Sequence, residues 1–294
     1  MYIALICLAT FMFSVQFVFN DVYQRGEGAS VVTAMLFSGL TGLAGCVMLM
    51  LTSADAFQYS FFSMGLAFIS AAKNVLSAYL SIIVLSRANL SVYSLYSMLG
   101  GMLLPFAYAI AFEGEAFTWQ KGVCAALIMV ALLMGVKGKD SSEADEQRGG
   151  SPLLWYLGVF VMNGLSGVFS TIHQRAGDIA VSASAYSLME RGWGLVICII
   201  VLLVCRMRGQ AITLKRPMRS IGSSMGYGLI TTIANLILLI ALLHVDASVQ
   251  YPIVTGGVIV LSLMWDWILG KKPNRYAVGA AAVSFAGLLF LTIK

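Results

Sequence analysis

The chain has 294 residues, of which 60% are hydrophobic and only 11% are charged, and its mean hydropathy is +0.89. Soluble domains average about 45–50% apolar and about 25% charged residues, so this composition excludes an ordinary soluble enzyme, a disordered chain and a disulfide-rich scaffold. The formal net charge is +5. The basic residues lie mostly between apolar runs, where loop bias and anionic lipid account for them without nucleic acid.

Ten long apolar runs follow one another along the chain. They are continuous, which excludes the alternating pattern of membrane strands, and a spanning helix needs about 20 residues. We therefore expect an all-α integral membrane protein in the inner cell membrane. The first run lacks a basic leader and a small-residue cleavage site, so we expect a retained helix rather than a signal peptide. The expected spans are residues 2–20, 30–52, 59–86, 90–112, 117–137, 153–173, 180–205, 218–243, 248–270 and 276–293.

The two halves of the sequence resemble each other. Matches at one common spacing pair Ser91 with Ser248, Val92 with Val249, Gly100 with Gly257 and Gly122 with Gly279. We expect a first five-helix repeat at 1–137, a polar linker at 138–151 and a second repeat at 152–294. An odd number of spans inverts the second copy in the membrane. Inverted repeats are typical of secondary transporters, which bind substrate near the midplane between the halves.

Three ionisable residues lie well inside expected spans: Lys73, Glu190 and Arg191. Such a residue costs about 2.5–3.5 kcal/mol on insertion scales, so it usually faces a cavity or a partner. Neighbouring helical residues point about 100° apart, so Glu190 and Arg191 cannot both face one group. Either Glu190 pairs with Lys73 and only fixes the packing, or the three line a cavity. In a cavity their sum of +1 favours an anionic or zwitterionic solute, with Glu190 as amine ligand or proton carrier.

Uncharged polar residues extend this candidate site. Each could line the cavity or join helices by a hydrogen bond. Two histidines at span ends, His173 and His244, are either interfacial residues or proton relays. The uncharged candidates for substrate binding are Asn74, Tyr96, Asn163, Ser166, Asn235, Gln250 and Tyr251.

Two stretches carry a family resemblance: 112–122, with an acidic turn leading to Gly122, and 241–257, with Pro252 and a Gly pair. They resemble the drug/metabolite transporter superfamily, of the EamA-like ten-helix kind, and the resemblance covers nearly the whole chain. It implies that helices 1–4 and 6–9 surround the cavity, and that both termini are cytoplasmic. Lysine stands at 271 and 272, where that family usually has Glu.

The distribution of basic residues favours the opposite orientation. Most of the Lys and Arg residues lie in the odd-numbered connections between spans. Basic loops are usually cytoplasmic, so this bias places both termini outside. The two orientations stay open at this point.

The sequence thus predicts a secondary transporter that moves a small polar organic metabolite, anionic or zwitterionic, such as an amino acid, by alternating access. No nucleotide-binding or metal motif occurs, so we expect no enzyme, no cofactor and no ATP. The expected partners are the solute, the bilayer and protons as a candidate coupling ion, in a monomer or homodimer. One alternative is a scaffold or lipid scramblase. Another is a serine protease using the GxSG sequence at Ser166, which needs a histidine within reach.

Overall fold

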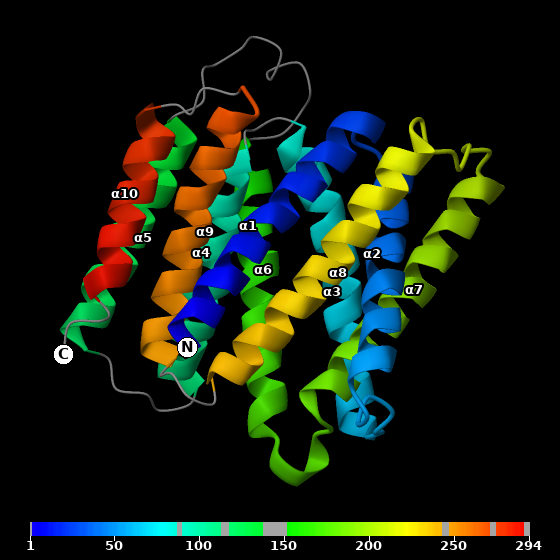
Figure 1. Cartoon of the computed structure of the whole chain (residues 1–294), viewed down its shortest axis with the longest axis horizontal. Coiled ribbons are helices and arrows are strands. Elements are labelled where there is room, and N and C mark those ends of the chain that lie inside the picture. The colour runs from blue at the N-terminus through cyan, green and yellow to red at the C-terminus, as the bar shows by residue number, and fades with distance from the viewer. Residues whose placement is uncertain are drawn as a thin grey trace. The chain divides into compact units, whose positions relative to one another are not determined.

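The computed structural model describes residues 2–86, 90–112, 118–137, 152–242, 247–270 and 275–290, and this part of the chain is helical, with no strand (Figure 1). Its ten α-helices confirm the expected number and order of helices, and most ends agree within a few residues. A 3-10 turn, η2 (Gly177–Ile179), precedes α7. The helices are α1 (Tyr2–Glu27), α2 (Val31–Thr52), α3 (Phe61–Leu85), α4 (Leu90–Phe112), α5 (Trp119–Lys137), α6 (Pro152–Arg175), α7 (Ala183–Met207), α8 (Pro217–Leu242), α9 (Ala247–Ile268) and α10 (Arg275–Phe290).

Seven of these helices are long and apolar enough to cross a membrane: α1, α2, α3, α4, α6, α7 and α8. In the described part of the chain, α5 and α9 contain shorter apolar stretches, Gly122–Ala131 and Ile253–Ile268. Length and composition therefore support seven of the ten expected spans directly.

The first helix is longer than the sequence predicted, because α1 continues from residue 20 to Glu27. Hydropathy falls in this segment, so hydropathy alone predicts an end near residue 20. The helix persists because its polar side chains are covered by protein: Asp21 is 1% exposed and Glu27 is 3% exposed. It ends at Gly28, whose φ of 83° favours glycine and whose N–H bonds to the Gln24 carbonyl at 2.7 Å.

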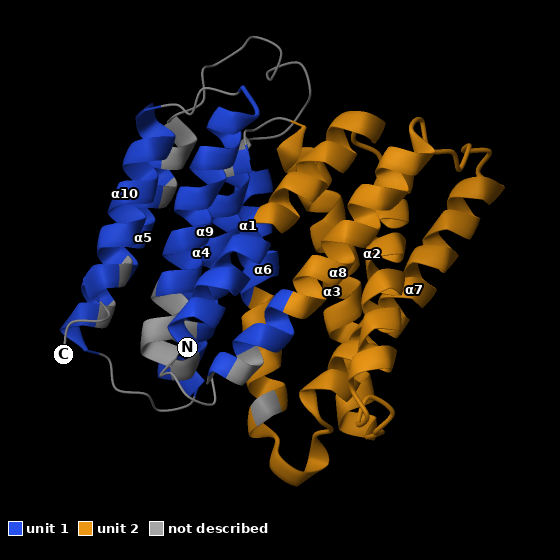
Figure 2. Ribbon diagram, in the orientation of Figure 1, with its two compact units in different colours: residues 1–14, 87–164, 234–294 blue, residues 15–86, 165–233 orange. Residues whose placement is uncertain are grey.

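The chain folds into two compact units (Figure 2). Unit 1 contains residues 1–14, 87–164 and 234–294, and unit 2 contains residues 15–86 and 165–233. In unit 1, α4 packs on α9 and α5 packs on α10, whereas in unit 2 both α2 and α3 pack on α7. Each unit thus draws helices from both halves of the sequence. The inverted repeat itself stays a prediction.

Close helix contacts in both units depend on glycine. In unit 2, a Cβ added at Gly228 of α8 would meet the Thr41 backbone of α2. In unit 1, a Cβ at Gly100 of α4 would meet the Phe160 backbone of α6. Helices approach this closely only where a side chain is missing, as at small-residue interfaces in membranes. Gly100 is therefore a packing position between α4 and α6.

Candidate functional site

Four of the expected site residues meet in unit 2, where α3, α6 and α7 come together. Lys73 of α3 donates a hydrogen bond to Ser166 Oγ of α6. Asn74 Nδ2, the next residue of α3, donates to Glu190 Oε1 of α7 at 2.8 Å. Ser70, one turn earlier on α3, also donates to Glu190 Oε1. We call Ser70, Lys73, Asn74, Ser166 and Glu190 the α3–α6–α7 cluster.

The cluster does not contain the expected ion pair. Lys73, Glu190 and Arg191 are all described, and neither cation forms a salt bridge with Glu190. The ammonium of Lys73 interacts electrostatically with Glu190 over a longer distance. Glu190 and Lys73 therefore do not form the ion pair that would only fix the packing. Both lie on helices that are long and apolar enough to span a membrane.

The cluster keeps binding capacity unused. Both hydrogen bonds to Glu190 end on Oε1, and within the described residues Oε2 has none. Lys73 is 7% exposed, and its ammonium has three donors, of which Ser166 takes one. Glu190 and Ser166 are half-buried. The cluster can therefore offer an acceptor to a cationic group and donors to an anionic group of one small solute.

Arg191 lies apart from the cluster, as the angle between adjacent helical residues requires. Its guanidinium occupies the space beside Gly45 of α2, where a Cβ would clash with it. Glu190, Cys46 and Tyr227 interact with it electrostatically. In the described part of the chain Arg191 has no hydrogen bond or ion pair. Of the three expected charges, Glu190 and Lys73 thus lie on the α3 side of α7, whereas the Arg191 guanidinium lies on the α2 side.

Next to the cluster, the contacts of His173 with Ser63 and Tyr186 were not predicted from the sequence. His173, at the end of α6, is 3% exposed and shares a 3.1 Å hydrogen bond with Ser63 of α3. Its ring stacks on Tyr186 of α7, with centroids 4.1 Å apart. His173 is therefore enclosed by protein at the end of α6, and both the interfacial and the proton-relay interpretations stay predictions. A signal was present, since Ser166, Ser170 and His173 recur at spacings of four and three, which share one helix face. His244 lies outside the described residues.

Two further expectations about α7 are corrected or refined. The glycines on either side of Trp193 suggest a close backbone approach, but a Cβ added at Gly192 or Gly194 meets no described atom within 4 Å. The close approaches occur instead on α2, at Gly42 and Gly45. Trp193 itself packs edge-on against Phe68 of α3, with ring centroids 5.2 Å apart.

The remaining site candidates belong to unit 1. Tyr96 of α4 is fully buried and stacks on Tyr156 of α6, with centroids 5.0 Å apart. Asn163 of α6 donates to the Ser97 carbonyl of α4. Asn235 of α8 is exposed. The side chains of Gln250 and Tyr251 lie outside the described ones. Tyr96 and Asn163 therefore join α4 to α6 within unit 1.

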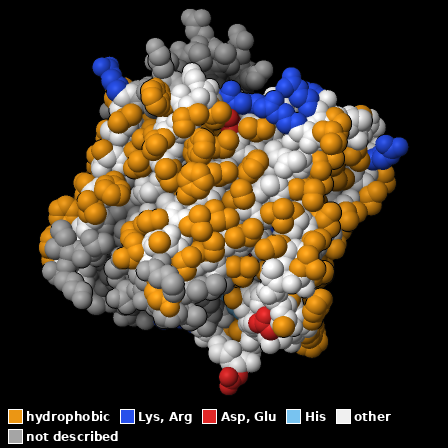
Figure 3. Space-filling model, viewed as in Figure 1, with side chains coloured by type: hydrophobic (Ala, Val, Ile, Leu, Met, Phe, Trp, Pro, Cys, Tyr) orange, Lys and Arg blue, Asp and Glu red, His pale blue; other side chains and the backbone are white. Residues whose placement is uncertain are grey.

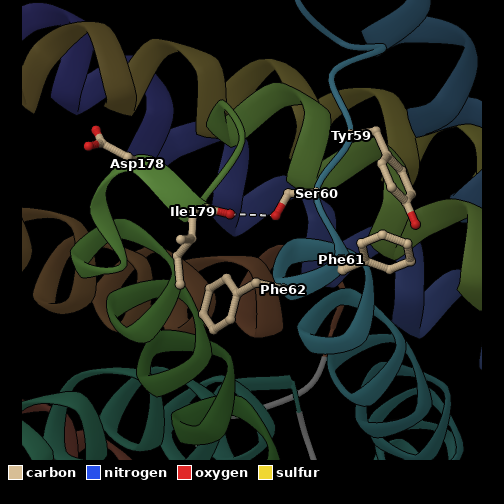
Figure 4. A pocket seen from close by; sticks show the side chains of 6 residues that line it. All are labelled: Tyr59, Ser60, Phe61, Phe62, Asp178 and Ile179. Atoms are coloured by element: carbon tan, nitrogen blue, oxygen red, sulfur yellow. Dashed lines mark hydrogen bonds between the residues drawn. The ribbon is translucent and has the colours of Figure 1, made fainter.

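At one end of unit 2, hydrogen bonds join the α2–α3 loop to the start of α7. Asp55, in the α2–α3 loop, accepts a 2.8 Å hydrogen bond from Ser184 Oγ. Gln58 Oε1 accepts one of 2.9 Å from the Ser182 N–H. The Ser182 and Ser184 hydroxyls hold the pKa of the Asp55 carboxyl below its ordinary value. A pocket of about 510 Å³ lies at this end, and it contains none of the expected site residues. Its lining is Tyr59, Ser60, Phe61, Phe62, Asp178 and Ile179, with Ser60 Oγ donating to the Ile179 carbonyl (Figure 4).

Comparisons with known proteins identify a similar fold and do not indicate an activity. No protein-family model and no curated protein matches the sequence. A solved structure described only as "Crystal structure of protein" is similar to the chain, with a TM-score of 0.62 and 16% sequence identity; the match covers 98% of this chain and 96% of that one. At this identity the two share a fold, and function has to be argued from the site.

Proposed function

We propose that the protein is a secondary transporter of the EamA-like kind, which moves a small anionic or zwitterionic metabolite across the inner membrane by alternating access. The observation that carries this proposal is the α3–α6–α7 cluster. It holds a lysine and a glutamate on candidate membrane helices that are not paired with each other. Unpaired charges at such depth are costly, and they are typical of substrate and ion pathways.

The cluster supports distinct roles for its members. Lys73 binds the anionic group of the solute through the ammonium donors that Ser166 does not take, while Ser166 holds that ammonium in place. Glu190 binds a cationic group or a coupling proton at Oε2, while Ser70 and Asn74 fix its orientation through Oε1. Arg191 faces α2 and α8 instead, and we assign it to the packing of that side of α7.

Helix packing within each unit supports the transporter class independently. The pairs α2–α7, α4–α9 and α5–α10 unite helices at matching positions of the two sequence halves. Two copies of a five-helix repeat that had duplicated would bring such mates together. This support is architectural, and it does not identify the solute.

A thermal-shift screen tests the proposal. The detergent-purified protein is screened against amino acids, organic acids, amines and nucleobases, together with Lys73→Met and Glu190→Gln. A ligand that binds only the folded state increases the free energy of unfolding, by about 2.7 kcal/mol when its concentration is a hundred times Kd, and so raises the melting temperature. We expect an anionic or zwitterionic hit that Lys73→Met abolishes. Asp178→Asn, in an exposed turn, is the matched control and keeps the response.

The proposal fails if the hits are unaffected by both cluster variants. It also fails if all hits are cations that respond normally in Lys73→Met. A cluster variant that has lost its fold is recognised by a melting temperature without ligand below that of the control variant.

The bond from Lys73 to Ser166 favours a second candidate function. A lysine beside a serine is the arrangement of Ser–Lys nucleophilic enzymes, in which a neutral lysine accepts the serine proton. His173 does not serve this role, because it is bonded to Ser63. Covalent labelling of Ser166 by a fluorophosphonate, lost in Ser166→Ala, would favour a hydrolase over a transporter.

A further inference from the structure

The strongest charged surface of unit 2 lies where α7 ends and α8 begins. Five basic side chains are exposed between residues 206 and 219, and this stretch contains no acidic residue. Figure 3 shows Lys and Arg side chains gathered at this end of the molecule. We call these five residues the basic rim: Arg206, Arg208, Lys215, Arg216 and Arg219.

Contacts of the backbone hold the basic rim in place. At the end of α7, Gly209 has a φ of 77°, and the N–H of Gln210 bonds back to the Cys205 carbonyl at 3.0 Å. Leu214 packs against the hydrophobic core of unit 2. Glu27 then accepts bonds from the N–H groups of Lys215 at 2.7 Å and Arg216 at 3.0 Å. The loop is therefore pinned at three points, and its cations are presented without a large loss of conformational freedom on binding.

Apolar side chains border the same cations. Met207 is 79% exposed and Met218 is 86% exposed, and both lie next to basic residues in the sequence. The neighbouring Arg25 is not part of the rim, because it pairs with Asp21 at 2.9 Å. The opposite end of unit 2 carries the acidic residues Asp55 and Asp178. A surface of cations beside exposed methionines matches a molecule with an anionic head and an apolar tail.

We propose that the basic rim binds anionic phospholipid of the surrounding leaflet, with the phosphate on the arginines and Lys215 and the acyl chains beside Met207 and Met218. This interaction goes beyond the proposed transport activity and does not depend on the solute. Bound lipid ties the end of α7 to the start of α8. Because α7 also carries Glu190, the lipid stabilises the helix that supports the α3–α6–α7 cluster.

Titration with short-chain lipid tests this assignment. The protein in an uncharged maltoside detergent is titrated with dihexanoylphosphatidylglycerol, with dihexanoylphosphatidylcholine and with inorganic phosphate, and the melting temperature is recorded. We expect phosphatidylglycerol to stabilise at the lowest concentration. Each basic residue near an anionic surface contributes about 1 kcal/mol, which is about a fivefold change in affinity. Arg206→Gln/Arg208→Gln/Lys215→Gln should therefore weaken the response by roughly a hundredfold.

The control is Arg175→Gln, which removes an exposed cation at the opposite end of unit 2 and should respond like the wild type. If the triple variant does not fold, the salt dependence of the wild type decides, because added salt should weaken the response to phosphatidylglycerol alone. Equal responses to both lipids, an unchanged response in the triple variant, or a response to inorganic phosphate matching that to phosphatidylglycerol would each overturn the proposal.

Discussion

Replacing Glu27 by glutamine should destabilise unit 2 through the start of α8. The carboxylate is 3% exposed, and it accepts three bonds from the other segment: the N–H groups of Lys215 and Arg216, and Ser220 Oγ. These N–H groups precede Pro217, the first residue of α8, and the helix itself does not satisfy them. A glutamine side chain at this position would keep one acceptor oxygen and turn an NH₂ group toward an N–H donor.

The size of the effect follows from the bonds that are lost. A hydrogen bond to a charged group is worth about 1.5–3 kcal/mol, and an anion near a helix N-terminus adds about 0.3–1 kcal/mol. We expect Glu27→Gln to lower the free energy of unfolding by about 2–3 kcal/mol. At about 2–4 °C per kcal/mol, the melting temperature in detergent should fall by roughly 4–12 °C. Asp178→Asn is the control, and it should stay within about 0.5 kcal/mol. Equal melting temperatures for the two variants would refute the reasoning.

Three further predictions follow from the helices and loops. Gly228→Ala should lower the melting temperature, because the added Cβ meets the Thr41 backbone. Gly192→Ala should leave the melting temperature unchanged or raise it, since that position is open and Ala favours helix over Gly by up to about 1 kcal/mol. The reverse order of melting temperatures would refute the packing. The folded-state pKa of Asp55 is lowered, so its contact stabilises the loops above the unfolded-state pKa and is lost as pH falls through the folded value. Amide hydrogen exchange at 53–60 should therefore increase at acid pH, and Ser184→Ala should weaken that dependence, because Ser182 also lowers the pKa of Asp55. Basic loops are usually cytoplasmic, so we expect the basic end of unit 2 to face the cytoplasm. In a Cys7→Ser background, Arg208→Cys should then react with an impermeant maleimide from the cytoplasmic side and Asp178→Cys from the other side. Reversed labelling would support the opposite orientation.

Much of the fold could be predicted because hydropathy reports the same property that membrane helices need. The ten apolar runs became ten helices, and the largest error fell on α1, where covered polar residues extend the helix. Hydropathy cannot detect this, since it measures the side chain and not its surroundings. The sequence likewise could not predict which glycines make close contacts, because that depends on the neighbouring helix, as at Gly45 and Gly192.

The candidate site was predicted in its composition and missed in its connections. Charge inside apolar runs identified Lys73, Glu190 and Arg191 as candidates, but Arg191, which we expected to bind the solute together with Lys73, lies beside Gly45 of α2. The partners of Glu190 could not be predicted, because Ser70 and Asn74 reach it through the packing of α3 on α7. The burial of His173 depends in the same way on Ser63 and Tyr186, which lie on other helices.

The most direct test of the central claim is counterflow in proteoliposomes. Vesicles containing the protein are loaded with the unlabelled solute from the thermal-shift screen and diluted into trace labelled solute. The account predicts transient accumulation of label with the wild type and with Asp178→Asn, and none with Lys73→Met. Accumulation at the wild-type rate in both Lys73→Met and Glu190→Gln would contradict the account, because the α3–α6–α7 cluster would then not be the solute site.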